Sequence, residues 1–215
     1  MGNNNSKLLL KEFATFDYKK STDEQGKEKR SKYGNLLVRG IIQRADALNQ
    51  NGRIYPKNIL SREVENYMPK VKERASPGEL DHADSPVVEW KTTSHIITDM
   101  WWEGNDLWGE VEVLEEMDQG RQLAVLFKND IKVGISSRAL GSLQKLGEAN
   151  VVQDDLFLVC WDFVSEPSTY GAFMMKETKE YSEEELKRIL SKSDRLDRVV
   201  NEVLSFKNKN KKDNK

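Results

Sequence analysis

The hydrophobic pattern of the chain changes near residue 34. Residues 17–34 are charged and almost free of aliphatic side chains, which is typical of a segment that does not fold. Beyond them, short runs of apolar and polar residues alternate as far as about residue 175. We therefore expect a largely disordered segment over 1–33, a folded domain over 34–175 and a separate helical, lysine-rich tail over 176–215.

Four stretches of the central region have the pattern of β-strands. Residues 35–48 alternate and contain β-branched side chains. Residues 93–115 contain two β-rich runs around Gly104-Asn105, a two-residue signal of a tight hairpin. Residues 132–143, KVGISSRALGSL, also predict a strand, and residues 155–164 are apolar on both faces, as in a strand buried on both sides.

Helical spacing is found in three places. Pro56 fits a first helical position, and six apolar residues follow at spacings of three and four: Ile59, Leu60, Val64, Tyr67, Met68 and Val71. Pro69 should end or kink this helix. Asp118 can cap a short second helix, and Ser182 with Glu185 forms a capping box at the start of the tail. Several strands with two or three helices predict an α+β fold.

The charge of the chain is unevenly distributed. The net charge is −2, but residues 207–215 (KNKNKKDNK) carry +4, which leaves −6 on the other 206 residues. An acidic body argues against a nucleic-acid partner, because binding to phosphates needs clustered cations. A single cysteine, Cys160, excludes an internal disulfide and a cysteine zinc site, and it fits a reducing compartment. No apolar run of about 18 residues is present to span a membrane.

Only two histidines can act as a general base. His95 lies within a predicted strand, where it is expected to be a packed residue. His82 lies in a loop bounded by glycine and proline, next to Glu79, Asp81 and Asp84, and loops on a rigid scaffold often carry catalytic groups. The alternatives for His82 are a surface side chain or a metal ligand, although no second histidine or cysteine is nearby.

Ser136 and Asp162 complete a candidate catalytic set with His82. A serine hydroxyl attacks only when a base takes its proton, and a carboxylate can fix the tautomer of that base. Asp162 lies in a strand that otherwise resembles core, so its carboxylate needs a partner. That partner is either an arginine or backbone amide, which is the structural alternative, or the histidine. Surface serines near a strand end remain the alternative for Ser136.

Five motifs together resemble one protein family. They occur in order within a similarity that runs from about residue 34 to residue 174: NGRIYP (51–56), GELDH (78–82), IITDMWWEGNDLWG (96–109), GISSRALGSL (134–143) and WDFVSEPS (161–168). This set resembles the prohead proteases of T-even-type bacteriophages, and the tail beyond Met175 lies outside the resemblance. By position, the resemblance places the catalytic histidine at His82, the nucleophile at Ser136 and the third member at Asp162.

The resemblance also implies a fold and a biological role. The fold would be a mostly antiparallel β-barrel core wrapped by helices, related to herpesvirus assemblins, without cofactor or metal. The enzyme would act inside the immature phage head in the bacterial cytoplasm. Its substrates and partners would be scaffold or core proteins and the major capsid protein precursor. It would also process itself and could self-associate.

Cleavage in this family favours the bond after a glutamate that has an aliphatic residue two positions earlier. Leu114-Glu115-Glu116 and Val200-Asn201-Glu202 fit that pattern. The first lies in or beside a predicted strand, so the second is the better candidate for self-cleavage. Cutting there would release the lysine-rich end.

Further roles can be assigned around the predicted nucleophile. The backbone near Ser137 and Arg138, or Gly141, is the expected source of an oxyanion hole. Arg138 or Arg53 could bind the glutamate of a substrate, although both also fit ordinary salt bridges.

Two other functions compete with proteolysis. The chain could be an inactive, protease-like structural component of the head core, which the presence of both Ser136 and His82 argues against. It could instead bind nucleic acid through its lysine-rich tail, but that tail is short and has no interleaved aromatic residues.

Overall fold

The computed structural model describes residues 7–22, 26, 28–81, 85–165, 180–182 and 184–188. The chain divides into two compact units, one of residues 8–180 and one of residues 1–7 with 181–215. The first unit contains every described candidate for catalysis. In the described part of the chain, no helix is long and apolar enough to cross a membrane.

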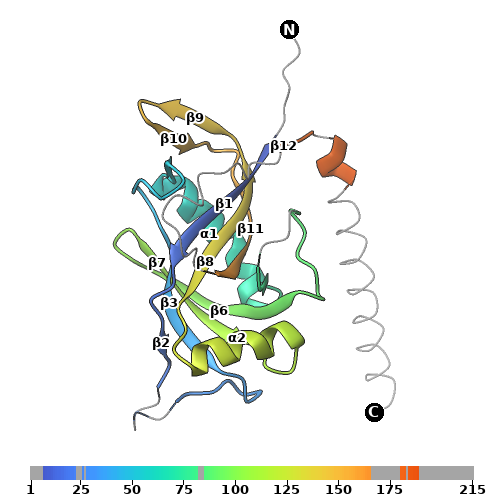
Figure 1. Ribbon diagram of the computed structural model, residues 1–215. Coiled ribbons are helices and arrows are strands. Elements are labelled where there is room, and N and C mark those ends of the chain that lie inside the picture. Colours follow the sequence, from blue (N-terminus) through green and yellow to red (C-terminus); the bar gives the residue numbers. More distant parts are fainter. Residues whose placement is uncertain are drawn as a thin grey trace, which may run out of the picture. The chain divides into compact units, whose positions relative to one another are not determined.

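The sheet that carries the predicted nucleophile has three strands within the larger unit. They are β1 (Lys7–Thr15), β8 (Val133–Gly141) and β11 (Phe157–Ser165), in the order β11-β8-β1, and all pairs are antiparallel. Figure 1 shows β1 and β8 side by side. All nine residues of β8 are buried, so the predicted strand is central rather than a solvated edge.

Strand β1 corrects the prediction of a largely disordered N-terminal segment. Residues 8–15 pair with β8, and Leu9 and Leu10 are buried. The partner strand lies far along the chain, and it satisfies the backbone groups that would otherwise remain unpaired. Three leucines in a charged segment were too short a pattern to predict this strand.

A second sheet has five antiparallel strands. Its order is β2-β3-β7-β6-β5, formed by β2 (Lys19–Lys20), β3 (Leu37–Arg44), β7 (Asp106–Val113), β6 (Thr93–Glu103) and β5 (Pro77–Glu79). The predicted hairpin is confirmed as β6 and β7, joined at Gly104, which has a φ of +59°. Strand β5 lies in a stretch that we expected to be a loop.

A third, small sheet lies beyond the end of β8. The strands β9 (Leu143–Leu146) and β10 (Ala149–Val152) form a hairpin, and β10 also pairs in parallel with β4 (Arg53–Ile54). The polar sequence of this hairpin did not predict it. The remaining strand, β12 (Glu180–Tyr181), lies at the boundary between the two units.

The fold is mixed α and β with mostly antiparallel sheets, as predicted, but the described strands do not close into a barrel. They form three separate sheets. A single parallel bridge, between Leu80 and Phe163, connects the end of β5 to β11. One bridge does not make a continuous ladder, so the five-stranded and the β1–β8–β11 sheets remain open.

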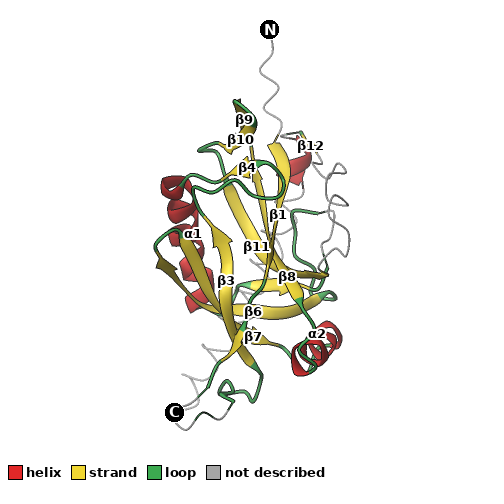
Figure 2. Ribbon diagram, turned by 60° about the vertical axis from the view of Figure 1, so that its left-hand side comes forward, coloured by secondary structure: helices red, strands yellow, loops and turns green. Residues whose placement is uncertain are grey.

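Two helices pack on these sheets (Figure 2). Helix α1 (Lys57–Lys72) begins after Pro56 and buries the predicted apolar face, with Tyr67 edge-on to Trp161 of β11 at a ring distance of 5.3 Å. It continues through Pro69 instead of ending there. Helix α2 (Asp118–Lys128) buries Leu123 and Phe127. Its Asp118 occupies the first helical position rather than the cap.

The smaller unit confirms one local prediction. The amide of Glu185 donates to the Ser182 hydroxyl at 3.2 Å, and the Glu185 carboxylate accepts from the amide of Ser182 at 3.0 Å. These reciprocal bonds are the predicted capping box, and residues 184–188 are helical.

A buried carboxyl on β1 should make stability depend on pH. Burial raises the pKa of Glu12 to about 8, although Arg53, Asn51 and Asn49 oppose the shift. The folded protein therefore keeps a proton that the unfolded chain releases near pH 4.5. We expect the free energy of unfolding to fall as pH rises from about 6.5 to about 8, by up to ~1.4 kcal/mol per pH unit. Below about pH 6.5 the buried His95, whose pKa is lowered to about 4, contributes the opposite slope.

The substitution Glu12→Gln should remove this slope, because glutamine cannot titrate. Urea unfolding between pH 5 and 9 measures it, and Glu116→Gln at an exposed site is the control. An unchanged slope in Glu12→Gln would show that another group is responsible.

Candidate active site

The pairing of β8 with β11 brings together two of the three predicted catalytic residues. Ser136 lies directly opposite Asp162 in this antiparallel register. Residues opposite one another in such a pair point to the same face of the sheet. Ser136 is 1% exposed and Asp162 is fully buried. The hydroxyl and the carboxylate therefore share one buried face.

The carboxylate of Asp162 has an arginine and a backbone amide as partners. Arg138 Nε lies 3.0 Å from Oδ2 and Nη2 lies 3.2 Å from Oδ1, while the amide of Glu79 donates to Oδ1 at 2.9 Å. These are the structural partners that we considered from the sequence. Both Arg138 and Glu79 are fully buried, so the carboxylate is held rigidly.

The predicted base, His82, lies outside the described residues, but both flanks of segment 82–84 are defined. The amide of Asp81 donates to the carbonyl of Phe163 at 2.8 Å. On the other side, Arg138 Nη1 donates to the carbonyl of Ser85 at 2.8 Å. The two flanks thus contact the strand of Asp162 and the strand of Ser136.

The second serine differs from the first. Ser137 pairs with Glu12 of β1 and with Trp161 of β11, on the opposite face of the sheet from Ser136. Its hydroxyl is buried and has no hydrogen-bond partner in the described part of the protein. This orientation follows from the alternation of side chains along a β-strand.

The structure argues against the predicted oxyanion donors. As the central strand, β8 pairs on both sides, so the amides of Ser137 and Arg138 lie within its ladders. Gly141 is five residues from Ser136 along the strand, or about 16 Å at ~3.3 Å per residue. A donor must lie about 3 Å from the reacting oxygen. Gly141 is therefore too distant from Ser136.

Neither arginine that we considered for substrate binding has an unoccupied guanidinium. Arg138 is fully buried, and its guanidinium contacts Glu79, Asp162, Cys160 and the carbonyl of Ser85. Burial lowers its pKa, but the neighbouring acidic groups outweigh burial and raise it, so Arg138 stays charged. Arg53 donates to the carbonyl of Lys11 at 2.9 Å.

The second histidine is a packed strand residue, as expected. His95 is fully buried, with Nδ1 2.8 Å from the Ser94 hydroxyl and Nε2 3.1 Å from the carbonyl of Trp161. Burial lowers its pKa to about 4, against the raising effect of Asp162. A neutral, enclosed imidazole of this kind is not available to a substrate.

The contacts of two buried groups in this region were not predicted. Glu79 was noticed only as an acidic neighbour of His82, yet its carboxylate binds Arg138 and also accepts from the amide of Glu89 at 2.8 Å. Cys160 Sγ lies 3.3 Å from Asp162 Oδ1, and burial raises the pKa of its thiol. A lone arginine between core residues, as in ISSRAL, was the available signal for a buried carboxylate partner.

The described side chains offer no metal site. Outside the segments that the structure leaves undescribed, His, Cys, Asp and Glu form no group of three that could hold a metal ion. The chemistry of the described face is that of a serine hydroxyl beside a fixed carboxylate.

Comparisons with known proteins agree with this chemistry. Residues 13–185 match the family described as prohead core protein serine protease. Over 124 residues, the chain is 36% identical to the prohead core protein protease of Enterobacteria phage T4, an alignment that covers 57% of this chain and 58% of that protein. The chain therefore spans less than two thirds of that relative's length.

A solved structure is similar as well. The bacteriophage T4 capsid assembly protease, gp21, superposes with a TM-score of 0.66 at 30% identity, over 75% of this chain and 99% of that chain. Because the family match spans most of the sequence and includes β8, β11 and both flanks of segment 82–84, the chain belongs to the prohead core protein serine protease family.

Proposed function

We propose that this protein is a serine endopeptidase that matures phage proheads. The observation that carries the proposal is that Ser136 and Asp162 lie opposite one another on a buried face of the sheet. The segment that leads into His82 is hydrogen-bonded to the strand of Asp162, through the amide of Asp81 and the carbonyl of Phe163. The family match supports the same reaction class. The proposed substrates are the scaffold or core proteins and the major capsid protein precursor, inside the prohead.

In the proposed mechanism, His82 accepts the proton of Ser136 as the hydroxyl oxygen attacks the peptide carbonyl. The resulting imidazolium returns this proton to the leaving amine as the C–N bond breaks, which leaves an acyl-enzyme. Water, deprotonated by His82, then hydrolyses the ester and restores the hydroxyl of Ser136. Asp162 contributes a fixed negative charge that stabilises the imidazolium.

The proposal includes cleavage after glutamate and self-processing after Glu202. The rival bond, Glu116–Met117, lies in a tight turn, where the amide of Met117 donates to the carbonyl of Leu114 at 2.9 Å. Glu115 beside it is held by Arg30 and Lys128. A protease that binds an extended peptide would have to unfold this turn first.

Incubation of the purified chain should therefore release residues 203–215 and leave the bond after Glu116 intact. Intact-mass spectrometry over time measures both cuts. Glu202→Gln should abolish the product, whereas Glu116→Gln should not affect it. Cleavage after Glu116 in the wild-type chain would contradict the proposed preference.

We also retain the relationship to herpesvirus assemblins as a proposal. The mostly antiparallel sheets with α1 and α2 packed on them are compatible with it. Superposing β8 and β11 on an assemblin structure tests it, and a different strand order around the nucleophile would contradict it.

A further inference from the structure

The three buried charges next to Ser136 form one connected group, which we call the buried ion cluster: Glu79, Arg138 and Asp162. All three are fully buried. Arg138 follows Ser136 by two residues on β8, so both side chains point to the same face of the strand. Formal charges in this cluster sum to −1. A buried arginine between two carboxylates is held by its hydrogen bonds, because each unpaired charge would be strongly unfavourable.

The buried ion cluster fastens the segment that precedes His82. The amide of Glu79 donates to Asp162, and its carboxylate binds Arg138. Two residues later, the amide of Asp81 donates to the carbonyl of Phe163 at 2.8 Å. The flank from Glu79 to Asp81 is thus fixed to β11 through side chain and backbone.

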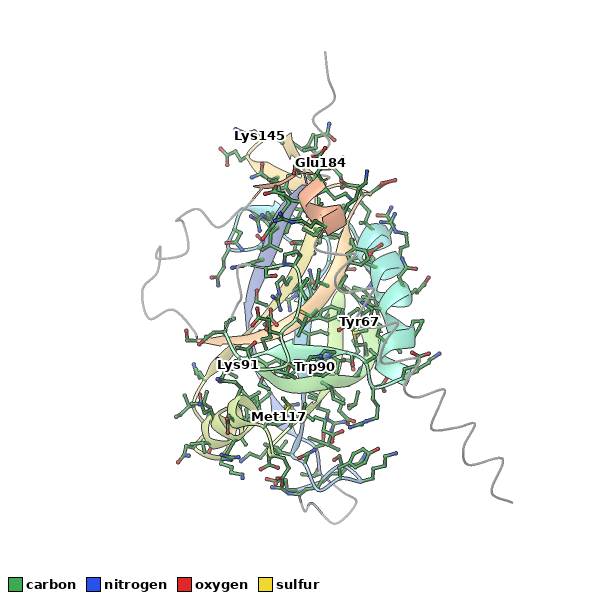
Figure 3. All side chains as sticks on the ribbon, turned by 90° about the vertical axis from the view of Figure 1, so that its right-hand side faces the viewer. Tyr67, Trp90, Lys91, Met117, Lys145 and Glu184 are labelled. Atoms are coloured by element: carbon green, nitrogen blue, oxygen red, sulfur yellow. The ribbon has the colours of Figure 1, made fainter. Side chains whose placement is uncertain are left out.

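The same cluster fastens the segment that follows. Arg138 Nη1 donates to the carbonyl of Ser85 at 2.8 Å. The second carboxylate oxygen of Glu79 accepts from the amide of Glu89 at 2.8 Å and from the hydroxyl of Thr92. Beside these anchors, Glu89, Trp90 and Lys91 are exposed, and Trp90 is 69% exposed (Figure 3).

We propose that Arg138 is a positioning residue for catalysis, which fixes both flanks of segment 82–84 against the strand that carries Ser136. The inference rests on the proposed function in one respect, namely that His82 in this segment is the catalytic base. Arg138 itself does not touch the substrate, because its guanidinium is fully buried and occupied by carboxylates and a backbone carbonyl. A planar guanidinium suits this role, since its fork binds both carboxylates and the carbonyl at once.

The substitution Arg138→Lys tests the proposal, because lysine keeps the charge and loses the fork. Native-state hydrogen exchange measures how firmly the two flanks of segment 82–84 are held, and it needs no substrate. The amides of Glu79, Asp81 and Glu89 should exchange at least about tenfold faster relative to those of the β6–β7 hairpin. The control, Arg121→Lys in a surface ion pair with Asp118 of helix α2, should leave this ratio unchanged.

Kinetics with a peptide that has glutamate before the cleaved bond provide the second reading. A misplaced base should lower kcat about 100-fold, while KM stays within about twofold. A rise in KM with unchanged kcat would instead make Arg138 a substrate-binding residue and overturn the proposal. Unchanged exchange ratios at the three amides would overturn it whatever the activity.

The two proposals can fail separately. Faster exchange at the three amides with no peptide cleavage by the wild-type protein would support the anchoring role of Arg138 and refute the proposed function. Glu79→Gln serves if Arg138→Lys does not fold, because it keeps the side-chain shape and removes one partner of Arg138. The same changes in exchange ratio and kcat are expected, and the same results contradict them.

Discussion

Replacing Ser136 by alanine should abolish cleavage of prohead proteins while leaving the fold intact. Loss of a serine nucleophile lowers kcat by about 10⁴-fold or more, because what remains is stabilisation by the surrounding site alone. Ser136 lies opposite Asp162, and alanine fits the same buried position. Gel analysis of capsid and core precursors mixed with the purified variants measures the effect.

The neighbouring Ser137→Ala is the matched control. Its hydroxyl faces away from Asp162 and is buried without a partner among the described residues. Removing an unsatisfied buried hydroxyl should leave activity unchanged and stability equal or slightly higher. Loss of cleavage in Ser137→Ala alone would reverse our assignment of the two serines.

Replacing Gly78 by alanine should be among the most destabilising single changes in the protein. A Cβ there would lie 2.0 Å from the carbonyl oxygen of Trp161 and 2.4 Å from two ring atoms of His95. Strands β5 and β11 would have to separate, at about 3 kcal/mol or more. Because Glu79 is the next residue, its hydrogen bond to Asp162 should be lost too, and activity should fall with stability.

Gly147→Ala provides the comparison for this effect. Gly147 has a φ of +63°, and a Cβ added there would meet no atom within 4 Å. The substitution therefore introduces only backbone strain of about 1–2 kcal/mol. Urea unfolding of both variants measures the difference. Equal destabilisation would show that close packing at Gly78 is not what requires glycine.

The sequence predicted those helices and strands whose determining residues are close together in the chain. The β6–β7 hairpin has its turn residues at Gly104-Asn105, helix α1 has its apolar face, and β11 has an apolar run. In each, the residues that determine the element are adjacent in sequence. The continuation of α1 through Pro69 shows tertiary packing outweighing a local preference.

The elements that were missed depend on distant partners. Strand β1 is fixed by β8 and strand β5 by β6 and β11. Their sequences are short, charged or rich in glycine and proline, so the strand pattern is absent. Gly78 illustrates the reason, because a larger residue there would clash with Trp161 and His95, which are distant in sequence.

The candidate site was predictable to a similar extent. Residue types and their place in predicted strands pointed to Ser136 and to Asp162. An arginine partner for Asp162 was among the alternatives, but the contacts that Glu79 and Arg138 make with both flanks of segment 82–84 could not be predicted, because they connect segments that are far apart in sequence. Arg138 could equally have been a substrate ligand until its burial and its carboxylate partners were known.

The central claim is that Ser136 is an activated nucleophile, and covalent labelling tests it most directly. Treating the folded protein with a fluorophosphonate and mapping the adduct by tandem mass spectrometry locates the reactive hydroxyl. We predict one adduct, on Ser136, which His82→Ala abolishes. An adduct on Ser137, or cleavage of capsid precursors that persists in Ser136→Ala without any adduct, would contradict the account.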